Sequence, residues 1–98
     1  MKNSRRESAP VEFRVEYRPT ADKDFDNIPE EYLDKIFSLI QPLAVNPQPR
    51  GCVKLKGKKN RYRIRCGKYR IVYKIDINNR IVLVEFIRHR KDIYRYLD

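Results

Sequence analysis

The spacing of apolar residues predicts two kinds of element in the first half of the chain. Residues 11–17 (VEFRVEY) alternate apolar and polar side chains, which is the pattern of a half-buried β-strand, and Pro19 ends this strand. Residues 20–28 (TADKDFDNI) predict a short helix. Asp22 and Asp24 would lie in its first turn, near the positive end of the helix dipole.

A second, longer helix is predicted from Pro29, because proline is favoured at the first helical position. Its apolar residues recur at helical spacing: Leu33, Ile36, Phe37, Ile40 and Leu43. Pro42 interrupts the pattern and is expected to end or kink the helix. Residues 46–51 (NPQPRG) then form a loop.

The spacing changes to a period of two after this loop. The predicted strands are residues 52–55 (CVKL), 61–65 (RYRIR), 69–76 (YRIVYKID) and 81–88 (IVLVEFIR). The last is apolar on both faces, which indicates an interior strand. Residues 89–97 (HRKDIYRYL) predict a loop with room for one helical turn.

The resulting order is a strand, two helices and then consecutive strands. Such an order indicates an α+β fold in which an N-terminal strand and a two-helix hairpin precede a curved, mostly antiparallel sheet, with the helices on one face. We expect a single domain over residues 11–98 after a flexible N-terminal tail of residues 1–10.

The chain shows no sign of a membrane or export segment. The longest apolar run is residues 81–84, too short to span a bilayer, and residues 1–10 lack the apolar stretch of a secretory signal. Cys52 and Cys66 match no zinc-binding spacing, so we expect reduced thiols, no metal and a cytoplasmic protein.

Charge is distributed very unevenly along the chain. Residues 1–49 contain 7 Lys and Arg against 9 Asp and Glu, whereas residues 50–98 contain 16 against 4. Residues 50–70 include 10 basic residues and no acidic one. This asymmetry predicts a surface that meets a polyanion, and nucleic acid is the leading candidate.

Arginines recur at every second position in residues 61–65, so they would form one face of a strand. The simpler interpretation is a solvated strand face, but such faces usually mix charges of both signs. We favour a phosphate-binding face, because the planar guanidinium matches pairs of phosphate oxygens. Arg63 and Arg65 would lie about 7 Å apart at ~3.3 Å per residue, a spacing suited to successive phosphates.

Further candidates lie near this face. The basic residues expected to contact RNA are Lys54, Lys56, Lys58, Lys59, Arg61 and Arg88. His89, the single histidine, is the side chain that titrates naturally near neutral pH, although a lone histidine is more often incidental than catalytic.

Two segments together resemble the RelE/ParE superfamily of bacterial and archaeal toxins. They are LKGKKNRYRIRCGKYRIVYKI (residues 55–75) and FIRHRKDIYRYL (residues 86–97). A K-L-x-G turn, a Y-R-I-R-x-G-x-Y-R-I-V-Y hairpin and a terminal H-R-x-x-x-Y recur in this order in that family. The preceding strand and helices agree as well.

The resemblance implies a ribosome-dependent endoribonuclease that uses no metal or other cofactor and is silenced by a cognate antitoxin. Its reaction is attack of a ribose 2′-hydroxyl on the adjacent phosphate. The residues that match the family's catalytic positions are Arg63, Arg65, Arg70, Arg90 (with Arg88 as the alternative) and Tyr94. Some relatives carry lysines at the first two positions. Arginine keeps its proton, so the better acid–base candidates are His89 and Tyr94.

Two other functions stay open at this point. A ParE-like toxin with the same fold would poison DNA gyrase and would need no nuclease residues. A plain RNA-binding module would bind without cutting and would tolerate the loss of Tyr94 and His89.

Overall fold

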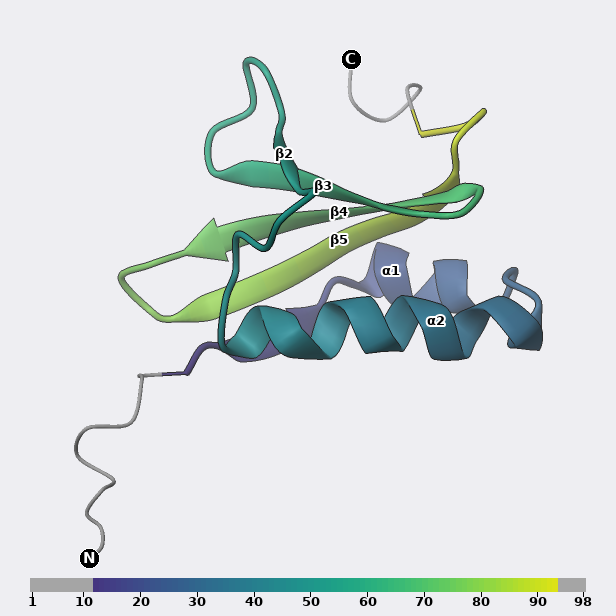
Figure 1. The fold of residues 1–98 in the computed structure, drawn as a ribbon, viewed down its shortest axis with the longest axis horizontal. Helices are drawn as coiled ribbons and strands as arrows, with labels where there is room; N and C mark the ends of the chain where they lie inside the picture. Colours follow the sequence, from purple (N-terminus) through teal and green to yellow (C-terminus); the bar gives the residue numbers. More distant parts are fainter. Residues whose placement is uncertain (1–11, 94–98) are drawn as a thin grey trace, which may run out of the picture.

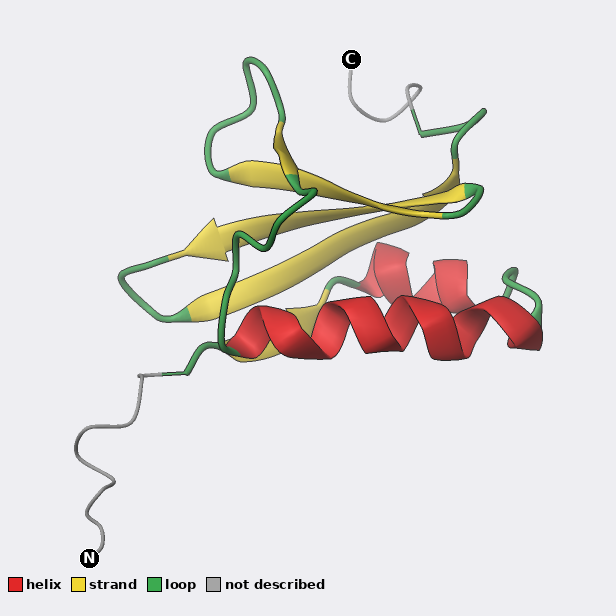
Figure 2. Ribbon diagram, viewed as in Figure 1, coloured by secondary structure: helices red, strands yellow, loops and turns green. Residues whose placement is uncertain are grey.

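The computed structural model describes residues 12–93, which form a mixed sheet with two helices against one of its faces (Figures 1 and 2). The elements in chain order are β1 (Arg14–Tyr17), α1 (Pro19–Phe25), α2 (Glu30–Ile40), the 3-10 turn η2 (Gln41–Ala44), β2 (Val53–Lys54), β3 (Arg61–Cys66), β4 (Tyr69–Asp76) and β5 (Ile81–His89).

The strands lie in the order β1-β5-β4-β3-β2. β1 pairs with β5 in parallel, while the other three pairings are antiparallel. The expected α+β architecture and the interior position of residues 81–88 are therefore confirmed. The parallel pairing of the first strand with the last was not foreseen. Parallel strands need a long connection, and here it comprises both helices and strands β2, β3 and β4.

Prolines set the bounds of both helices. Pro19 occupies the first turn of α1, one residue before the expected start. Pro29 is the N-cap of α2 rather than its first residue, and α2 ends at Ile40 before Pro42, which lies in η2. Among the described residues no helix is both long and apolar enough to cross a membrane.

The main core lies between the helices and the sheet. Buried side chains of α2, such as Ile36 and Ile40, pack against Ile71 and Tyr73 of β4 and Val84 of β5. Four tyrosines also belong to this core: Tyr17, Tyr62, Tyr69 and Tyr73. Cys66 is buried and Cys52 is partly buried, and both are free thiols.

α1 covers the edge of β5 that β1 leaves open. β1 ends opposite Val84, and from there side chains of α1 bind the strand's backbone. The Thr20 hydroxyl donates to the Glu85 carbonyl oxygen at 2.7 Å, and the Ile87 N–H donates to the Asp24 carboxylate at 2.9 Å. These bonds satisfy backbone groups that an edge strand would otherwise expose.

Candidate nucleic-acid interface

A bulge in β5 decides which side chains face the arginines. Val72 pairs with Phe86 and Tyr73 pairs with Val84, so Glu85 is an extra residue in β5. A regular strand would place Phe86 on the same face as Val84. The bulge instead places Phe86 on the face opposite the helices, and every later residue of β5 changes sides.

The basic residues of three adjacent strands share the face away from the helices, here called the arginine face. The register pairs Arg65 with Arg70 and Arg70 with Arg88, which places these three arginines in one row across β3, β4 and β5. Arg61 and Arg63 lie on the same face of β3. The predicted sharing of one strand face is confirmed for β3. Arg88 reaches this face only because of the bulge.

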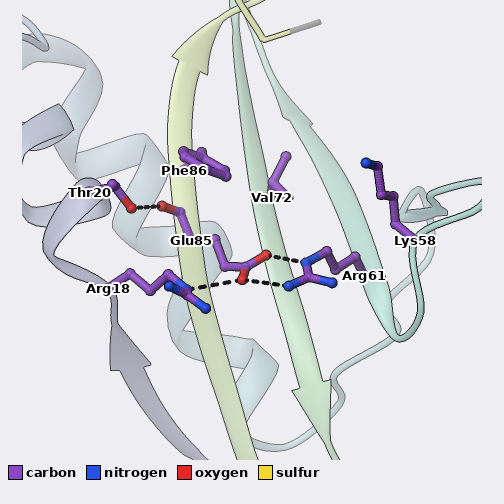
Figure 3. Close-up of a pocket in the computed structure, with 7 residues that line it drawn as sticks. All are labelled: Arg18, Thr20, Lys58, Arg61, Val72, Glu85 and Phe86. Atoms are coloured by element: carbon purple, nitrogen blue, oxygen red, sulfur yellow. Dashed lines mark hydrogen bonds and ion pairs between the residues drawn. The ribbon is translucent and has the colours of Figure 1, made fainter. Parts of the chain in front are cut away.

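Glu85 supplies the negative charge that residues 50–75 lack. Its side chain is 3% exposed, and its carboxylate accepts hydrogen bonds from Arg61 Nε at 2.6 Å, Arg61 Nη2 at 3.2 Å and Arg18 Nε at 3.1 Å (Figure 3). The hydrogen bond to Glu85 raises the pKa of Arg61 despite the opposing effect of desolvation. Repulsion along β3 is thus offset by a carboxylate on β5, on the far side of β4, and two guanidinium groups are held in fixed positions.

Arg70 is bound to the turn that precedes it. Its Nη1 donates to the carbonyl oxygens of Gly67 at 2.8 Å and Tyr69 at 2.9 Å, and the residue is 9% exposed. Gly67 has φ +58, a value that glycine adopts without strain, which suits the two-residue turn between β3 and β4. Arg70 therefore stabilises the hairpin as well as contributing charge to the face.

Arg63 and Arg65 line one cavity together with a third arginine. The cavity has a volume of about 400 Å³, and Arg50 and Gly51 from the preceding loop form its other side. Arg50 was not among the residues predicted for the site. Its position before the strand with the arginine repeat, inside the basic stretch, was the available signal.

Arg88 is held by a carboxylate from α1. Its Nε forms an ion pair with Asp24 at 2.7 Å, and the two side chains are 22% and 7% exposed. The Arg88 guanidinium also lies 5.6 Å from the centre of the Phe86 ring, within the range of a cation–π contact. Asp24, expected only to favour the helix dipole, instead positions a guanidinium at the edge of the arginine face.

The structure does not bring His89 to the arginine face. His89 pairs with Tyr69, and its ring meets the Tyr69 ring edge-on at 5.9 Å, on the side of the helices. Its Nδ1 accepts a hydrogen bond from the Lys91 backbone at 3.1 Å. Arg90 is exposed, and its backbone N–H donates to the Lys68 carbonyl at 2.7 Å. Tyr94 lies outside the described residues.

The predicted lysine contacts are spread over the β2–β3 hairpin. Lys54, Lys56 and Lys59 are exposed, and Lys58 lines the cavity beside Glu85. By register Lys54 shares the side of Tyr62 rather than that of Arg63. The lysines therefore surround the hairpin, whereas the arginines are concentrated on one face.

A small apolar cluster lies at the centre of the arginine face. Leu55, Val72 and Ile93 are buried together, and Phe86 packs against them. Ile93 is fully buried, so the turn that follows β5 is anchored on this face at residue 93. A bound chain would meet positive charge around an apolar centre.

This arrangement can stabilise negative charge but supplies few proton-transfer groups. Arginine does not lose its proton in proteins, so the described part of the face offers charge and hydrogen bonds to a phosphate. Within residues 12–93 no cluster of three or more His, Cys, Asp or Glu side chains is placed to hold a metal ion.

Comparison with known proteins gives one consistent group of relatives. Residues 15–94 match the family model described as the ParE toxin of the type II toxin–antitoxin system parDE. The putative toxin RelE1 of Methanocaldococcus jannaschii is 33% identical over 88 residues, which cover 87% of this chain and 98% of that protein.

Solved structures of similar chains agree with the fold. A chain of the RelB–RelE antitoxin–toxin complex from Methanococcus jannaschii is 28% identical with a TM-score of 0.70, and the match covers 86% of this chain and 100% of that one. A mutant E. coli toxin RelE in the free state is 18% identical with a TM-score of 0.73, covering 87% and 90% of the two chains, which shows likeness of fold alone. The expected fold is confirmed.

Proposed function

Because this chain belongs to the RelE/ParE family of type II toxin–antitoxin toxins, we propose that it is a ribosome-dependent endoribonuclease that cleaves mRNA. The observation that carries the proposal is the row of Arg65, Arg70 and Arg88 across three adjacent strands. Adjacent strands lie ~4.8 Å apart, so the three groups can surround a single phosphate and its neighbours.

In this reaction the ribose 2′-oxygen attacks the adjacent phosphorus and the bond to the 5′-oxygen of the next nucleotide breaks. The products are a cyclic phosphate and a free 5′-hydroxyl, once the 2′ proton is removed and the leaving oxygen is protonated. The guanidinium groups of Arg63, Arg65 and Arg70 stabilise the charge that develops on the phosphate. We propose Arg88, rather than Arg90, as the fourth arginine of the site, and its pairing with Arg70 across β4 and β5 supports this choice.

Proton transfer needs another group, because the arginines keep their protons. His89 is on the helix side of the sheet, so Tyr94 is the better candidate for acid–base chemistry in this proposal. A protein face with few bases also suits an enzyme that depends on the ribosome to place the mRNA in line for attack.

We further propose that a cognate antitoxin covers the arginine face. The relative from Methanococcus jannaschii was solved as a RelB–RelE antitoxin–toxin complex. An acidic or amphipathic partner would complement the positive charge around the Leu55–Val72–Ile93 cluster. We expect growth arrest when the chain is expressed alone and rescue when the antitoxin is co-expressed.

Primer extension on a translated mRNA tests the proposal. We expect site-specific cuts with ribosomes and none with naked mRNA. Arg65→Ala and Arg70→Ala should each slow cutting at least about tenfold, which corresponds to the loss of one charge-assisted contact in the transition state. Tyr94→Phe should slow it at least as much, because it removes the proposed acid–base group. Arg65→Ala is the clearest test of these three, because Arg65 is exposed and its loss should not disturb the fold. Arg70→Ala also removes a hydrogen bond that supports the hairpin. Arg14→Ala is the matched control.

The alternatives give different products in the same assays. Double-strand breaks made by gyrase, with mRNA intact, would indicate the ParE-like alternative. RNA binding that weakens with salt, without any cut, would indicate a binding module.

A further inference from the structure

The cavity beside Glu85 differs in chemistry from the rest of the arginine face. It has a volume of about 360 Å³, and its lining combines Arg18, Arg61 and Lys58 with the apolar side chains of Val72 and Phe86 (Figure 3). This volume is at the lower end of the range of roughly 300–1,000 Å³ that is typical of small-ligand sites. The bulge in β5 creates the cavity, because it directs Glu85 and Phe86 to the same face.

Glu85 acts inside this cavity as a clamp rather than as a free ligand group. Its two oxygens already accept three hydrogen bonds, whereas a guanidinium carries five N–H donors. Arg61 donates two of its N–H groups to Glu85, and Arg18 donates its Nε–H. The cavity therefore presents donors from guanidinium groups held in place by a carboxylate that is 3% exposed.

A bare phosphate would use these donors but not the apolar wall. A nucleobase uses both, because it has a flat face to lie against the partly buried Phe86 and an edge that carries hydrogen-bond acceptors. In single-stranded RNA, bases are commonly splayed out and read in this way by proteins. Among the bases, guanine offers O6 and N7 side by side, the pair that an arginine fork matches best.

We propose that the cavity lined by Arg18, Arg61, Glu85 and Phe86 binds one unstacked base of the RNA strand and favours guanine. The proposal deepens the proposed function and rests on it for the identity of the ligand as RNA. Arg61 and Lys58, expected to contact RNA as simple charges, then contribute to base selection. Glu85 is a positioning residue that holds the two arginines.

The test measures base preference without cleavage. Fluorescence anisotropy is recorded for four adenine heptamers that differ only in the central base (A, C, G or U), at low salt and without ribosomes. The net charge of +10 ensures that all four bind through their phosphates, so the ratio of dissociation constants reports the cavity. We expect the wild-type chain to bind the heptamer with central guanine at least about fivefold more tightly than the others.

The variants separate base reading from general charge. Glu85→Gln should reduce the preference below about twofold, while overall affinity stays equal or rises because a negative charge is lost. Arg18→Ala should also reduce the preference. The Arg18 side chain is half-exposed and makes no side-chain cap of α1, so its replacement should not disturb folding. Arg18→Ala therefore replaces Glu85→Gln in the test if Glu85→Gln does not fold. Arg14→Ala removes the same charge from another exposed arginine paired to a glutamate, and should keep the preference.

Equal binding of the four heptamers by the wild-type chain, a preference for another base, or a guanine preference that survives both Glu85→Gln and Arg18→Ala would overturn the proposal. Failure of the proposed function is distinguishable, because cleavage of translated mRNA is measured separately. A chain that prefers guanine but never cuts would contradict the nuclease and leave the base site standing.

Discussion

The ion pair between Asp24 and Arg88 gives a prediction whose size follows from burial. Arg88 Nε lies 2.7 Å from Asp24 Oδ1, and the Asp24 and Arg88 side chains are 7% and 22% exposed. Breaking a buried pair by removing one charge costs ~3–5 kcal/mol, and the partial exposure of Arg88 places this pair below that range. Asp24→Asn keeps an oxygen for the Ile87 N–H, so its effect isolates the charge.

A double-mutant cycle measures the pair directly. We expect Asp24→Asn and Arg88→Ala to be coupled by about 2 kcal/mol in urea unfolding, so that the double variant is much less destabilised than the sum of the singles. The Arg14–Glu16 pair, which is exposed, serves as the control cycle and should show no measurable coupling. Additivity of the Asp24 and Arg88 changes within ~0.5 kcal/mol would refute the reasoning.

Three further changes test other parts of the structure. Ile93→Ala should lower the free energy of unfolding by about 2 kcal/mol or more, because Ile93 is fully buried. The control Ile77→Ala, at a 70% exposed position, should change the free energy of unfolding by less than about 0.5 kcal/mol. Tyr73→Phe should cost about 1 kcal/mol, because the Tyr73 hydroxyl donates to the Pro47 carbonyl at 2.6 Å. Burial raises the pKa of Tyr73 in the folded chain, so above pH ~10 the Tyr73 hydroxyl loses its proton first in the unfolded chain. The free energy of unfolding therefore falls as the pH rises, and Tyr73→Phe should weaken that fall. Arg65→Ala should reduce the salt dependence of RNA binding by roughly one contact, and an unchanged slope would remove Arg65 from the interface.

The sequence was sufficient for the elements and for the strand face of the arginines. Alternation in residues 61–65 and 69–76 gives the face of each residue directly, since a strand has a period of two. The parallel pairing of β1 with β5 was not available from the pattern, because local alternation carries no information on which strands pair.

Which β5 side chains face the arginines was harder to predict, mainly because of the bulge at Glu85. One inserted residue exchanges the faces of Arg88 and His89, and no local pattern in IVLVEFIR marks it. His89 was therefore a natural acid–base candidate in the sequence although its ring lies among the helix-side residues. Glu85 itself looked like an ordinary strand residue, and its role depends on Arg18 and Arg61, which are distant in sequence.

The central claim is that the arginine face holds mRNA while it is cut on the ribosome. The most direct measurement is the single-turnover rate of cleavage of a ribosome-bound mRNA by the wild-type chain, Arg65→Ala and Arg14→Ala. The account predicts a rate at least about tenfold lower for Arg65→Ala and a wild-type rate for Arg14→Ala. Equal rates for all three chains, or cutting that does not depend on the ribosome, would contradict it.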